Sequence, residues 1–449
     1  MSRLQDRKEA RDGIAGLRAS TGAARVQVTA ALDLGASKVG CFIMKPDGLC
    51  RSDRTVRVAG VGYVQSRGVK AGAIVDVDAA GDAIAQAVER AEQMAGVSVS
   101  GVTIATAAGQ LASCTVQADV SLGVKPITDQ DLTRAIAAAL GQVRWPNRRP
   151  IHLLPISWTV DDQRGVRDPR SMHGRVLGLE LLVVTIQEGV FQTLARCLEP
   201  AHLELHGVVA APFASALAAL EDDEMDLGCV CVDMGGGATS AAVFANGSLV
   251  HVDSLSVGGA HVTADIARGL STSIAGAERV KTLHGSAIAS ANEDRETIEA
   301  PPRGDDPGAG PIVAPRSILK SIIAARVEET LELMRERLKA SGAPLEPGAG
   351  VVLTGGASQL AGVRELAVRV FDRPVRLGRP RRAPHLADAA AGPAFCAAAG
   401  VVLRAAYGPR EAVSVRKLMS TRIGPKDAPQ APQSGNVLTR AAGWLKENL

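Results

Sequence analysis

Two segments of this chain share one pattern, and its repetition constrains the fold more than any other feature of the sequence. Residues 26–44 (VQVTAALDLGASKVGCFIM) and 229–252 (CVCVDMGGGATSAAVFANGSLVHV) each contain an apolar strand, an aspartate, a glycine-bearing turn and a second apolar strand. The two aspartates, Asp33 and Asp233, are 200 residues apart. We therefore predict a duplicated α/β architecture in which each half contributes one turn to a ligand site between the halves.

Composition and length narrow the class of protein. A chain of 449 residues has room for roughly two to four domains. Lysine and arginine (50) nearly balance aspartate and glutamate (47), so the net charge of +3 offers no basic field for nucleic acid. The seven cysteines include no Cys-x-x-Cys pair, which is typical of reduced thiols in a cytoplasmic protein. We expect no secretory signal, because residues 1–20 mix both charge signs and lack a continuous apolar stretch. We also expect no transmembrane helix, because the apolar stretch 391–403 is too short to span a bilayer.

The remaining pattern divides into helices and loops. Apolar residues recur at helical spacing in residues 76–95 and 318–340, which predicts two helices that pack by one face. Residues 300–315 (APPRGDDPGAGPIVAP) are dense in proline and glycine and predict a loop. Residues 425–435 (PKDAPQAPQSG) predict an extended linker, after which helical periodicity returns in residues 436–449 (NVLTRAAGWLKENL).

The two aspartate turns have the chemistry of a phosphate site. A carboxylate at the end of a buried strand is costly unless a cation lies nearby, and Mg²⁺ bound to phosphates supplies one. Adjoining glycines let backbone N–H groups approach phosphate oxygens, and nearby hydroxyl and ammonium groups add donors. Either turn alone is more often a plain hairpin, so the prediction depends on the pair. The predicted phosphate-site residues are Asp33, Gly35, Ser37, Lys38, Asp233, Gly235, Gly236, Gly237 and Thr239.

A third element lies late in the chain. Residues 351–359 (VVLTGGASQ) read as an apolar strand that ends in Gly355 and Gly356, with a helical pattern from Leu360. A glycine pair lets an adenine ring lie flat against the backbone. The alternative is an ordinary strand-to-helix turn.

In this order, the two aspartate turns and the late GGAS turn resemble the actin, Hsp70 and sugar-kinase superfamily. The resemblance implies an actin-like ATPase fold, with two α/β halves around a cleft that binds ATP and Mg²⁺. The metal would be held by phosphates and water near Asp33 and Asp233. As plain residues, the Glu and Lys of GAERVKTLHG would form a solvated ion pair one helical turn apart. The residues that match the family's adenosine-binding positions are Glu278, Lys281, Gly355, Gly356 and Ala357.

One position departs from the superfamily pattern. In VVAAPFASALAAL, Ala211 occupies the place where Hsp70-like ATPases carry a glutamate that positions water. Alanine cannot orient a nucleophile. We therefore expect ATP binding with slow or no hydrolysis, and we assign no catalytic residue.

Other segments resemble the bacterial cell-division family FtsA in particular. QSRGVKAGAIVDVD, with Ser66, Arg67, Gly68, Gly72 and Asp76, is similar to a stretch characteristic of that family. HLLPISWTVDDQRGVRDPRSMHG resembles the end of its 1C insertion, although its pattern alone indicates only strand, loop and strand. The matching residues in that segment are His152, Pro155, Asp161, Gly165, Asp168, Pro169 and Gly174.

The last segment has the pattern of an amphipathic helix. On a helix, its apolar residues fall on one stripe, and the charged residues lie elsewhere. Its 14 residues would span about 21 Å, too short to cross a bilayer and suited to lie in the interface. The helix could equally dock on its own domain, but its position after a linker resembles the FtsA membrane-targeting helix. The residues on or beside the stripe are Leu438, Ala441, Trp444, Leu445 and Leu449.

The resemblance also implies partners and a place in the cell. It implies self-association into actin-like protofilaments, contact with the C-terminal peptide of FtsZ through subdomain 2B, and recruitment of later division proteins through 1C. Arg326 and Glu329 match positions on the FtsZ contact face, although they also suit a solvated helix face. The protein would bind membrane lipid peripherally, on the cytoplasmic face of the inner membrane at the division site, and no nucleic acid.

Two rival functions remain at this level. A soluble phosphotransferase of the sugar- or acetate-kinase type would need a catalytic aspartate, which we do not find in the sequence. A chaperone-like ATPase would need a large substrate domain after the ATP-binding fold. The predicted boundaries are a disordered N-terminal extension (1–24), subdomain 1A (25–106 and 185–220), the 1C insertion (107–184), subdomain 2A with its closing helix (221–264 and 347–408), subdomain 2B (265–346), a flexible linker (409–435) and the membrane-targeting helix (436–449).

Overall fold

The computed structural model divides the chain into two units, Met1–Ala412 and Val413–Leu449. All described residues belong to the first unit, so the predicted linker and membrane-targeting helix lie outside them, as does the N-terminal extension. The residues that the structure describes are 28–46, 56–123, 125–288, 295–304, 310–345, 348–381, 386 and 388–407.

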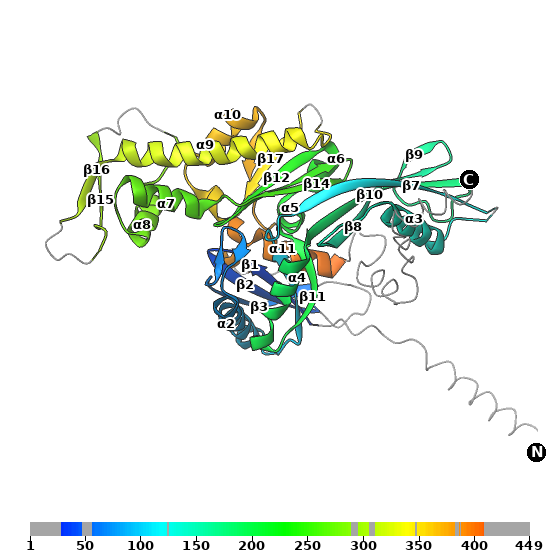
Figure 1. Ribbon diagram of the computed structural model, residues 1–449, viewed down its shortest axis with the longest axis horizontal. Coiled ribbons are helices and arrows are strands. Elements are labelled where there is room, and N and C mark those ends of the chain that lie inside the picture. Colours follow the sequence, from blue (N-terminus) through cyan, green and yellow to red (C-terminus); the bar gives the residue numbers. More distant parts are fainter. Residues whose placement is uncertain are drawn as a thin grey trace, which may run out of the picture. The chain divides into compact units, whose positions relative to one another are not determined.

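The first five-stranded sheet, called the N-sheet below, has the strand order β11-β6-β1-β2-β3. Helix α2 (Val77–Ala95) packs on β2 and β3, and Asp76 caps it by accepting a hydrogen bond from Ala79 N at 3.0 Å. The helix ends at Gly96, whose φ of 63° suits glycine. The helix predicted over residues 76–95 is thus confirmed (Figure 1). The strands of the N-sheet are β1 (Thr29–Leu34), β2 (Lys38–Pro46), β3 (Val56–Gln65), β6 (Gly101–Thr106) and β11 (Glu204–Ala210).

The second five-stranded sheet, called the C-sheet below, has the order β14-β13-β12-β17-β18. Its central strand β12 sends Cys229 and Cys231 into one hydrophobic core, and Val230 and Val232 into another. Successive side chains of a strand point to opposite faces of its sheet, so each face of the C-sheet packs against a hydrophobic core. The strands of the C-sheet are β12 (Cys229–Met234), β13 (Thr239–Ala245), β14 (Ser248–Leu255), β17 (Gly350–Thr354) and β18 (Val375–Leu377).

The two sheets repeat one arrangement, and the predicted duplication is confirmed. Asp33 lies opposite Gly40 in the antiparallel pair β1–β2, and β1 also runs parallel to β6. Asp233 lies opposite Ser240 in the antiparallel pair β12–β13, and β12 runs parallel to β17. Each aspartate therefore stands at the same place in its sheet.

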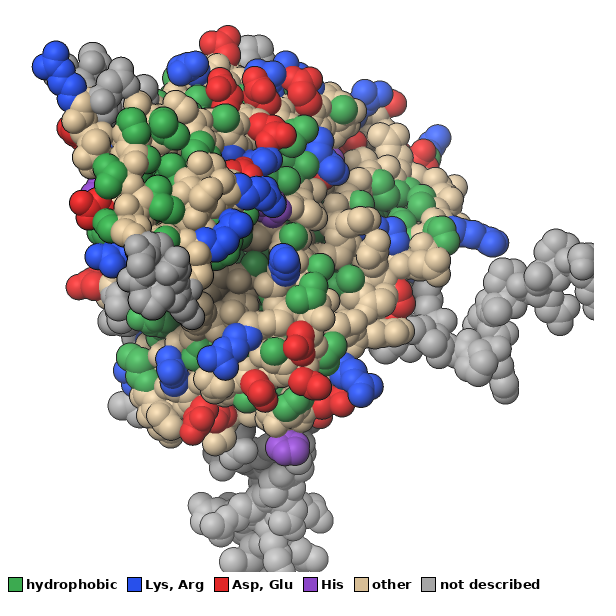
Figure 2. Space-filling view, turned by 60° about the vertical axis from the view of Figure 1, so that its left-hand side comes forward, with side chains coloured by type: hydrophobic (Ala, Val, Ile, Leu, Met, Phe, Trp, Pro, Cys, Tyr) green, Lys and Arg blue, Asp and Glu red, His purple; other side chains and the backbone are tan. Residues whose placement is uncertain are grey.

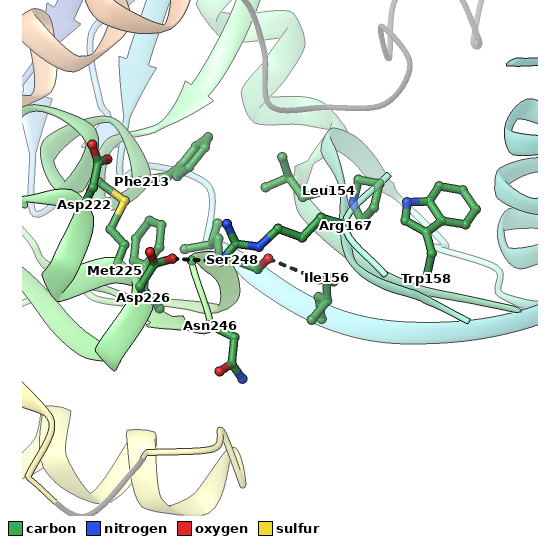
Figure 3. A pocket seen from close by; sticks show the side chains of 14 residues that line it. Leu154, Ile156, Trp158, Arg167, Phe213, Asp222, Met225, Asp226, Asn246 and Ser248 are labelled. Atoms are coloured by element: carbon green, nitrogen blue, oxygen red, sulfur yellow. Dashed lines mark hydrogen bonds and ion pairs between the residues drawn. The ribbon is translucent and has the colours of Figure 1, made fainter. Parts of the chain in front are cut away.

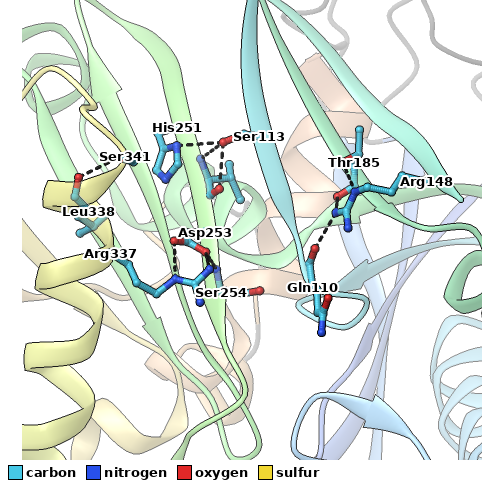
Figure 4. A network of polar contacts seen from close by, with 11 residues as sticks. Gln110, Ser113, Arg148, Thr185, His251, Asp253, Ser254, Arg337, Leu338 and Ser341 are labelled. Carbon is cyan, nitrogen blue, oxygen red and sulfur yellow. Dashed lines mark hydrogen bonds and ion pairs between the residues drawn. The ribbon is translucent and has the colours of Figure 1, made fainter. Parts of the chain in front are cut away.

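A four-stranded sheet, called the insert sheet below, has the order β7-β10-β8-β9. It contains the predicted strand, loop and strand of residues 152–185, with a short additional strand β9. Its edge strand β7 meets the edge strand β14 of the C-sheet through Ser113 (Figure 4). The Ser113 hydroxyl accepts from Val252 N at 2.9 Å and donates to Val252 O at 3.0 Å. The elements of this region are β7 (Ala112–Ser121), α3 (Asp129–Gln142), β8 (Arg148–Val160), β9 (Gln163–Val166) and β10 (Val176–Gln187).

The predicted loop over residues 300–315 is partly wrong. Residues Ile312–Pro315 form strand β16, antiparallel to β15 (Thr297–Ala300), because a short β-branched run follows the proline- and glycine-rich segment. The expected helix from Leu360 begins instead at Val363, after a 3-10 turn over Gly356–Gln359. The predicted helix 318–340 is confirmed as α9 (Arg316–Ala340), which packs on β13 and β14.

The remaining elements connect and cover the sheets. Helices α5 and α11 pack against each other, and α5 also contacts β12 and β13 of the C-sheet. These elements are β4 (Val69–Lys70), β5 (Ala73–Ile74), α4 (Glu188–Arg196), α5 (Ala211–Ala219), α6 (Asp222–Leu227), α7 (Gly259–Gly269), α8 (Ile274–His284), α10 (Val363–Phe371), α11 (Cys396–Tyr407), and 3-10 turns at Glu199–Ala201, Asp388–Ala390 and Pro393–Phe395.

Candidate functional site

The two glycine-bearing turns close in the same way. Gly35 N donates to Lys38 O at 3.1 Å, and Gly235 N donates to Ala238 O at 2.9 Å. The repeat at 200 residues thus extends to the hydrogen bonds of the turns. We call residues 35–38 loop one and residues 235–238 loop two.

The two loops face each other at close range. A Cβ atom added to Gly236 would overlap the Ser37 hydroxyl, and one added to Gly237 would lie 2.6 Å from Ala36 Cβ. Glycine is required at both positions because a side chain would push the loops apart. The structure therefore brings Ser37 close to the loop-two glycines, which the sequence assigned to the same phosphate site.

Charge in the site is dominated by two carboxylates and one ammonium group. Burial raises the pKa of Asp33 to about 7, against the opposing effect of Lys38, and Asp233 raises it further. Burial also raises the pKa of Asp233, while Ser215 and Lys38 act in the opposite direction. Burial lowers the pKa of Lys38 to about 8, although the two carboxylates oppose that change. The surplus of carboxylates over ammonium groups suits a divalent cation, with phosphate and water supplying its other oxygen ligands.

Lys38 is held by a segment from the other end of the chain. Its Nζ atom donates to Ala394 O and lies 3.1 Å from the centroid of the Phe395 ring. Both partners belong to the 3-10 turn that precedes α11. No local pattern predicts this contact, because Ala394 is 356 residues from Lys38.

The predicted adenosine-binding pair lies beside the start of α7. Glu278 and Lys281 form an ion pair at 2.6 Å, and both also bond the Thr263 hydroxyl, at 2.5 and 2.8 Å. The first amides of α7 donate to loop two: Gly259 N to Gly235 O at 3.0 Å, and Ala260 N to Gly236 O at 2.7 Å. Helix α7 therefore connects the pair to loop two.

The GGAS turn joins the same region. Gly355 has a φ of 84°, and a Cβ atom there would press on the Asp233 carboxylate. Ala357 Cβ lies 3.2 Å from the place that a Cβ on Gly259 would occupy. Four segments far apart in the sequence thus converge: the two loops, the start of α7 and the GGAS turn. Figure 2 shows a face of the molecule on which Lys and Arg side chains surround a hollow.

Several residues of interest have other contacts. The Thr239 side chain is fully buried, and its hydroxyl donates to Val257 O at 2.8 Å. The Thr239 hydroxyl therefore stabilises the strand that follows loop two, and its proton is not directed at a phosphate.

Arg326 on α9 pairs with Asp265 of α7 and with Glu329, both at 2.5 Å. The predicted membrane residues Leu438, Ala441, Trp444, Leu445 and Leu449 lie outside the described residues.

Sequence reasoning missed Ser215. Its hydroxyl donates to Asp233 Oδ2 at 2.6 Å from helix α5. The same helix begins at Ala211, which is 6% exposed and offers only a methyl group. Only the three-dimensional contact identifies Ser215, because a serine in an alanine-rich helix carries no distinctive pattern.

A cavity of about 400 Å³ lies between the insert sheet and the C-sheet (Figure 3). Its apolar lining includes Trp158 from β8 and Phe213 from α5. Arg167 and Asp226 form an exposed ion pair at 3.2 Å beside it. Ser248 donates to Ile156 O at 3.1 Å and so links β14 with β8. The sequence patterns did not predict this cavity.

Comparison with known proteins places the chain in a family. Residues 230–400 match the model of the family "Cell division protein FtsA", and residues 108–185 match the "SHS2 domain inserted in FTSA". The cell division protein FtsA of Rhizobium meliloti is 41% identical over 431 residues, which cover 95% of this chain and 96% of the relative. The chain belongs to the FtsA family of cell division proteins. The FtsA of Pseudomonas aeruginosa is 32% identical, over 93% of this chain and 97% of the relative.

The solved structures support the predicted fold class. The PilM–PilN type IV pilus biogenesis complex contains a chain with a TM-score of 0.59 and 17% sequence identity, covering 84% of this chain and 98% of that one. The FtsA chain has the actin-like ATPase fold with an inserted SHS2 domain, as predicted. Among the helices in the described part of the FtsA chain, none is both long and apolar enough to cross a membrane.

Proposed function

We propose that this FtsA chain binds Mg-ATP between loop one and loop two and anchors the FtsZ ring to the membrane. The observation that carries the nucleotide proposal is the convergence of the two loops, the start of α7 and the GGAS turn on one site. Backbone N–H groups of both loops would bind the phosphates, as glycine-rich turns do in other phosphate sites. Asp33 and Asp233 would hold Mg²⁺ through its water shell.

The other predicted residues take their places around the nucleotide. Glu278 and Lys281 would contact the ribose and adenine, since α7 brings them beside loop two. Gly355 and Gly356 would let the adenine lie against the backbone. Hydrolysis would be slow, because Ala211 offers no group to orient water. Steady turnover at ordinary enzyme rates by the pure protein would contradict this part of the proposal.

The adaptor role rests on family membership and on the pattern of the tail. Residues 436–449 would lie in the membrane interface with Trp444 at the level of the headgroups. One such helix of nearly neutral charge binds weakly, so self-association into filaments would strengthen attachment by avidity. Arg326 and Glu329 lie on α9 and would take part in binding the C-terminal peptide of FtsZ.

The insert sheet would recruit later division proteins. The cavity between β8, α5 and α6 has an apolar floor and a charged rim, which is the composition of a protein-binding pocket. The proposed adaptor role would place the protein on the cytoplasmic face of the inner membrane at the division site.

One experiment tests the adaptor role as a whole. Purified FtsZ and lipid vesicles are sedimented together with either the full chain or a chain ending at Gly435, each with Mg-ATP. We expect only the full chain to carry FtsZ into the pellet. If neither does so while folded and loaded with ATP, the adaptor role is wrong.

The nucleotide site has its own test. Asp33→Ala and Asp233→Ala proteins are compared with the unaltered chain for retention of Mg-ATP on a filter. We expect both variants to lose the nucleotide, because each removes a carboxylate that faces the cation. Retention by both variants would contradict the site assignment.

A further inference from the structure

We propose that Ser215 is a positioning residue for the nucleotide site. From one half of the fold, its hydroxyl holds the Asp233 carboxylate of the other half. This inference rests on the proposed binding of Mg-ATP. Helix α5, which carries Ser215, directly follows strand β11 of the N-sheet, whereas Asp233 stands near the end of β12 in the C-sheet. The hydrogen bond of 2.6 Å therefore joins the two halves at the site itself.

The Ser215 hydroxyl is a buried polar group in apolar surroundings. The side chain is 1% exposed, and its neighbours Ala214 and Ala216 are fully buried. Helix α11 packs so closely here that a Cβ on Gly400 would overlap Ala214 O. A buried hydroxyl is costly unless it is hydrogen-bonded, and an alanine would suit this apolar helix better. The bond to Asp233 offsets that cost.

The second oxygen of Asp233 is confined as well. Gly355 of the GGAS turn lies against Asp233 Oδ1, so closely that no Cβ could fit between them. Ser215 thus fixes one carboxylate oxygen and Gly355 limits the movement of the other. The carboxylate is oriented by groups from α5 and from the GGAS turn before any ligand arrives.

The bond also affects the charge of Asp233. A hydroxyl that donates to a carboxylate stabilises its ionised form, and here it opposes the burial that raises the pKa of Asp233. Lys38 acts in the same direction, but its ammonium group is shared with Asp33 and is bonded to Ala394 O. Ser215 is the neutral donor that belongs to Asp233 alone in the described part of the chain. An ionised Asp233 is the form that can hold hydrated Mg²⁺.

The test is the affinity of the full-length Ser215→Ala chain for a fluorescent ATP analogue, measured with Mg²⁺ and with the metal removed by EDTA. We expect binding with Mg²⁺ to be about tenfold weaker than in the unaltered chain, because a hydrogen bond to a charged group is lost. Without Mg²⁺ the loss should be much smaller, because Asp233 acts on the nucleotide through the cation.

A matched control separates this effect from general damage. Ser286 is also a buried serine, but it donates to Ile288 O within its own loop at 2.9 Å. Ser286→Ala should leave the affinity unchanged, both with and without Mg²⁺. If Ser215→Ala behaves like this control, or weakens binding by the same factor with and without Mg²⁺, the inference is wrong.

A double-mutant cycle gives a second readout. Because Asp233→Asn should itself lose Mg-ATP, the cycle is measured as the urea midpoint of the ligand-free chain. Adding Ser215→Ala to Asp233→Asn should lower the midpoint less than it does in the unaltered chain, because the hydroxyl there bonds a neutral group. Equal losses in both backgrounds would overturn the inference, because Ser215 would then act independently of the carboxylate. An unaltered chain that binds no Mg-ATP would instead overturn the proposed function, and this inference with it.

Discussion

Asp33 shows how folding sets the chemistry of this site at the scale of one residue. Burial raises its pKa from 3.8 to about 7, so between these values the folded chain binds a proton that the unfolded chain releases. The contribution of this carboxyl to stability is therefore most favourable below pH 4 and falls as the pH rises toward 7. A cation in the site would reverse that loss, because it favours the ionised form.

The first prediction follows from this loss of stability as the pH rises. Asp33→Asn should raise the free energy of unfolding of the ligand-free chain by roughly 4 kcal/mol at pH 8, and by only about 1 kcal/mol near pH 4.5. Urea unfolding at the two pH values measures the difference. A gain of equal size at both pH values would contradict the prediction, since it would not arise from ionisation.

Individual residues of the site differ in how far the sequence alone could predict them. The matching strands and turns around Asp33 and Asp233 were predictable because each shows a local pattern of strand, carboxylate and glycine turn, and the pattern occurs twice. Ser215 and Phe395 were not, because each acts on a residue that only the fold brings near. Ser215 lies 18 residues before Asp233 in a helix whose sequence indicates nothing but packing.

At the scale of elements, the β4–β5 hairpin connects the two loops. Near its base, Ser66 N donates to Ser37 O of loop one at 3.0 Å. At its tip, Gly72 N lies 2.9 Å from the place that a Cβ on Gly237 of loop two would occupy. The FtsA-like motif QSRGVKAG therefore corresponds to a bridge between the two loops. Only the resemblance marked this motif, because its residues read as an ordinary turn.

The second prediction concerns this bridge. Gly72→Val should speed the release of a fluorescent ATP analogue about fivefold, because a side chain at the tip would press on Ala238, 3.2 Å from the added Cβ. Gly165→Val is the matched control, since Gly165 has nearly the same backbone, with φ of 72° against 75°, and a Cβ there meets no atom within 4 Å. Equal release rates from the two variants, measured by stopped-flow displacement, would show that the hairpin does not restrain the loops.

The 300–315 segment shows why some elements were missed. Strand β16 is only four residues long and pairs with β15, on the far side of a proline- and glycine-rich stretch. A run this short carries too little alternation to be recognised, so composition favoured a loop. Helix α9, at 25 residues, repeats its apolar spacing often enough to be predicted correctly.

For the described unit as a whole, the insert sheet is the feature least predictable from pattern. Its strands indicated only a connecting segment, and the resemblance to the FtsA insertion supplied the rest. The structure adds the contact between β7 and β14, which are edge strands of separate sheets. An edge strand presents unpaired backbone groups, and here one hydroxyl, that of Ser113, satisfies both groups of Val252.

The last prediction tests this junction. Ser113→Ala should lower the free energy of unfolding by about 1–3 kcal/mol, because Val252 is buried and its N–H and C=O would lose their partner. Hydrogen exchange at the Val252 amide should speed up accordingly, as the insert sheet loosens from the C-sheet. The neighbouring exposed Cys114 provides the control, since Cys114→Ser should change neither quantity. Unchanged exchange in Ser113→Ala would mean that other contacts, such as Ser248 with Ile156, hold the two sheets together without it.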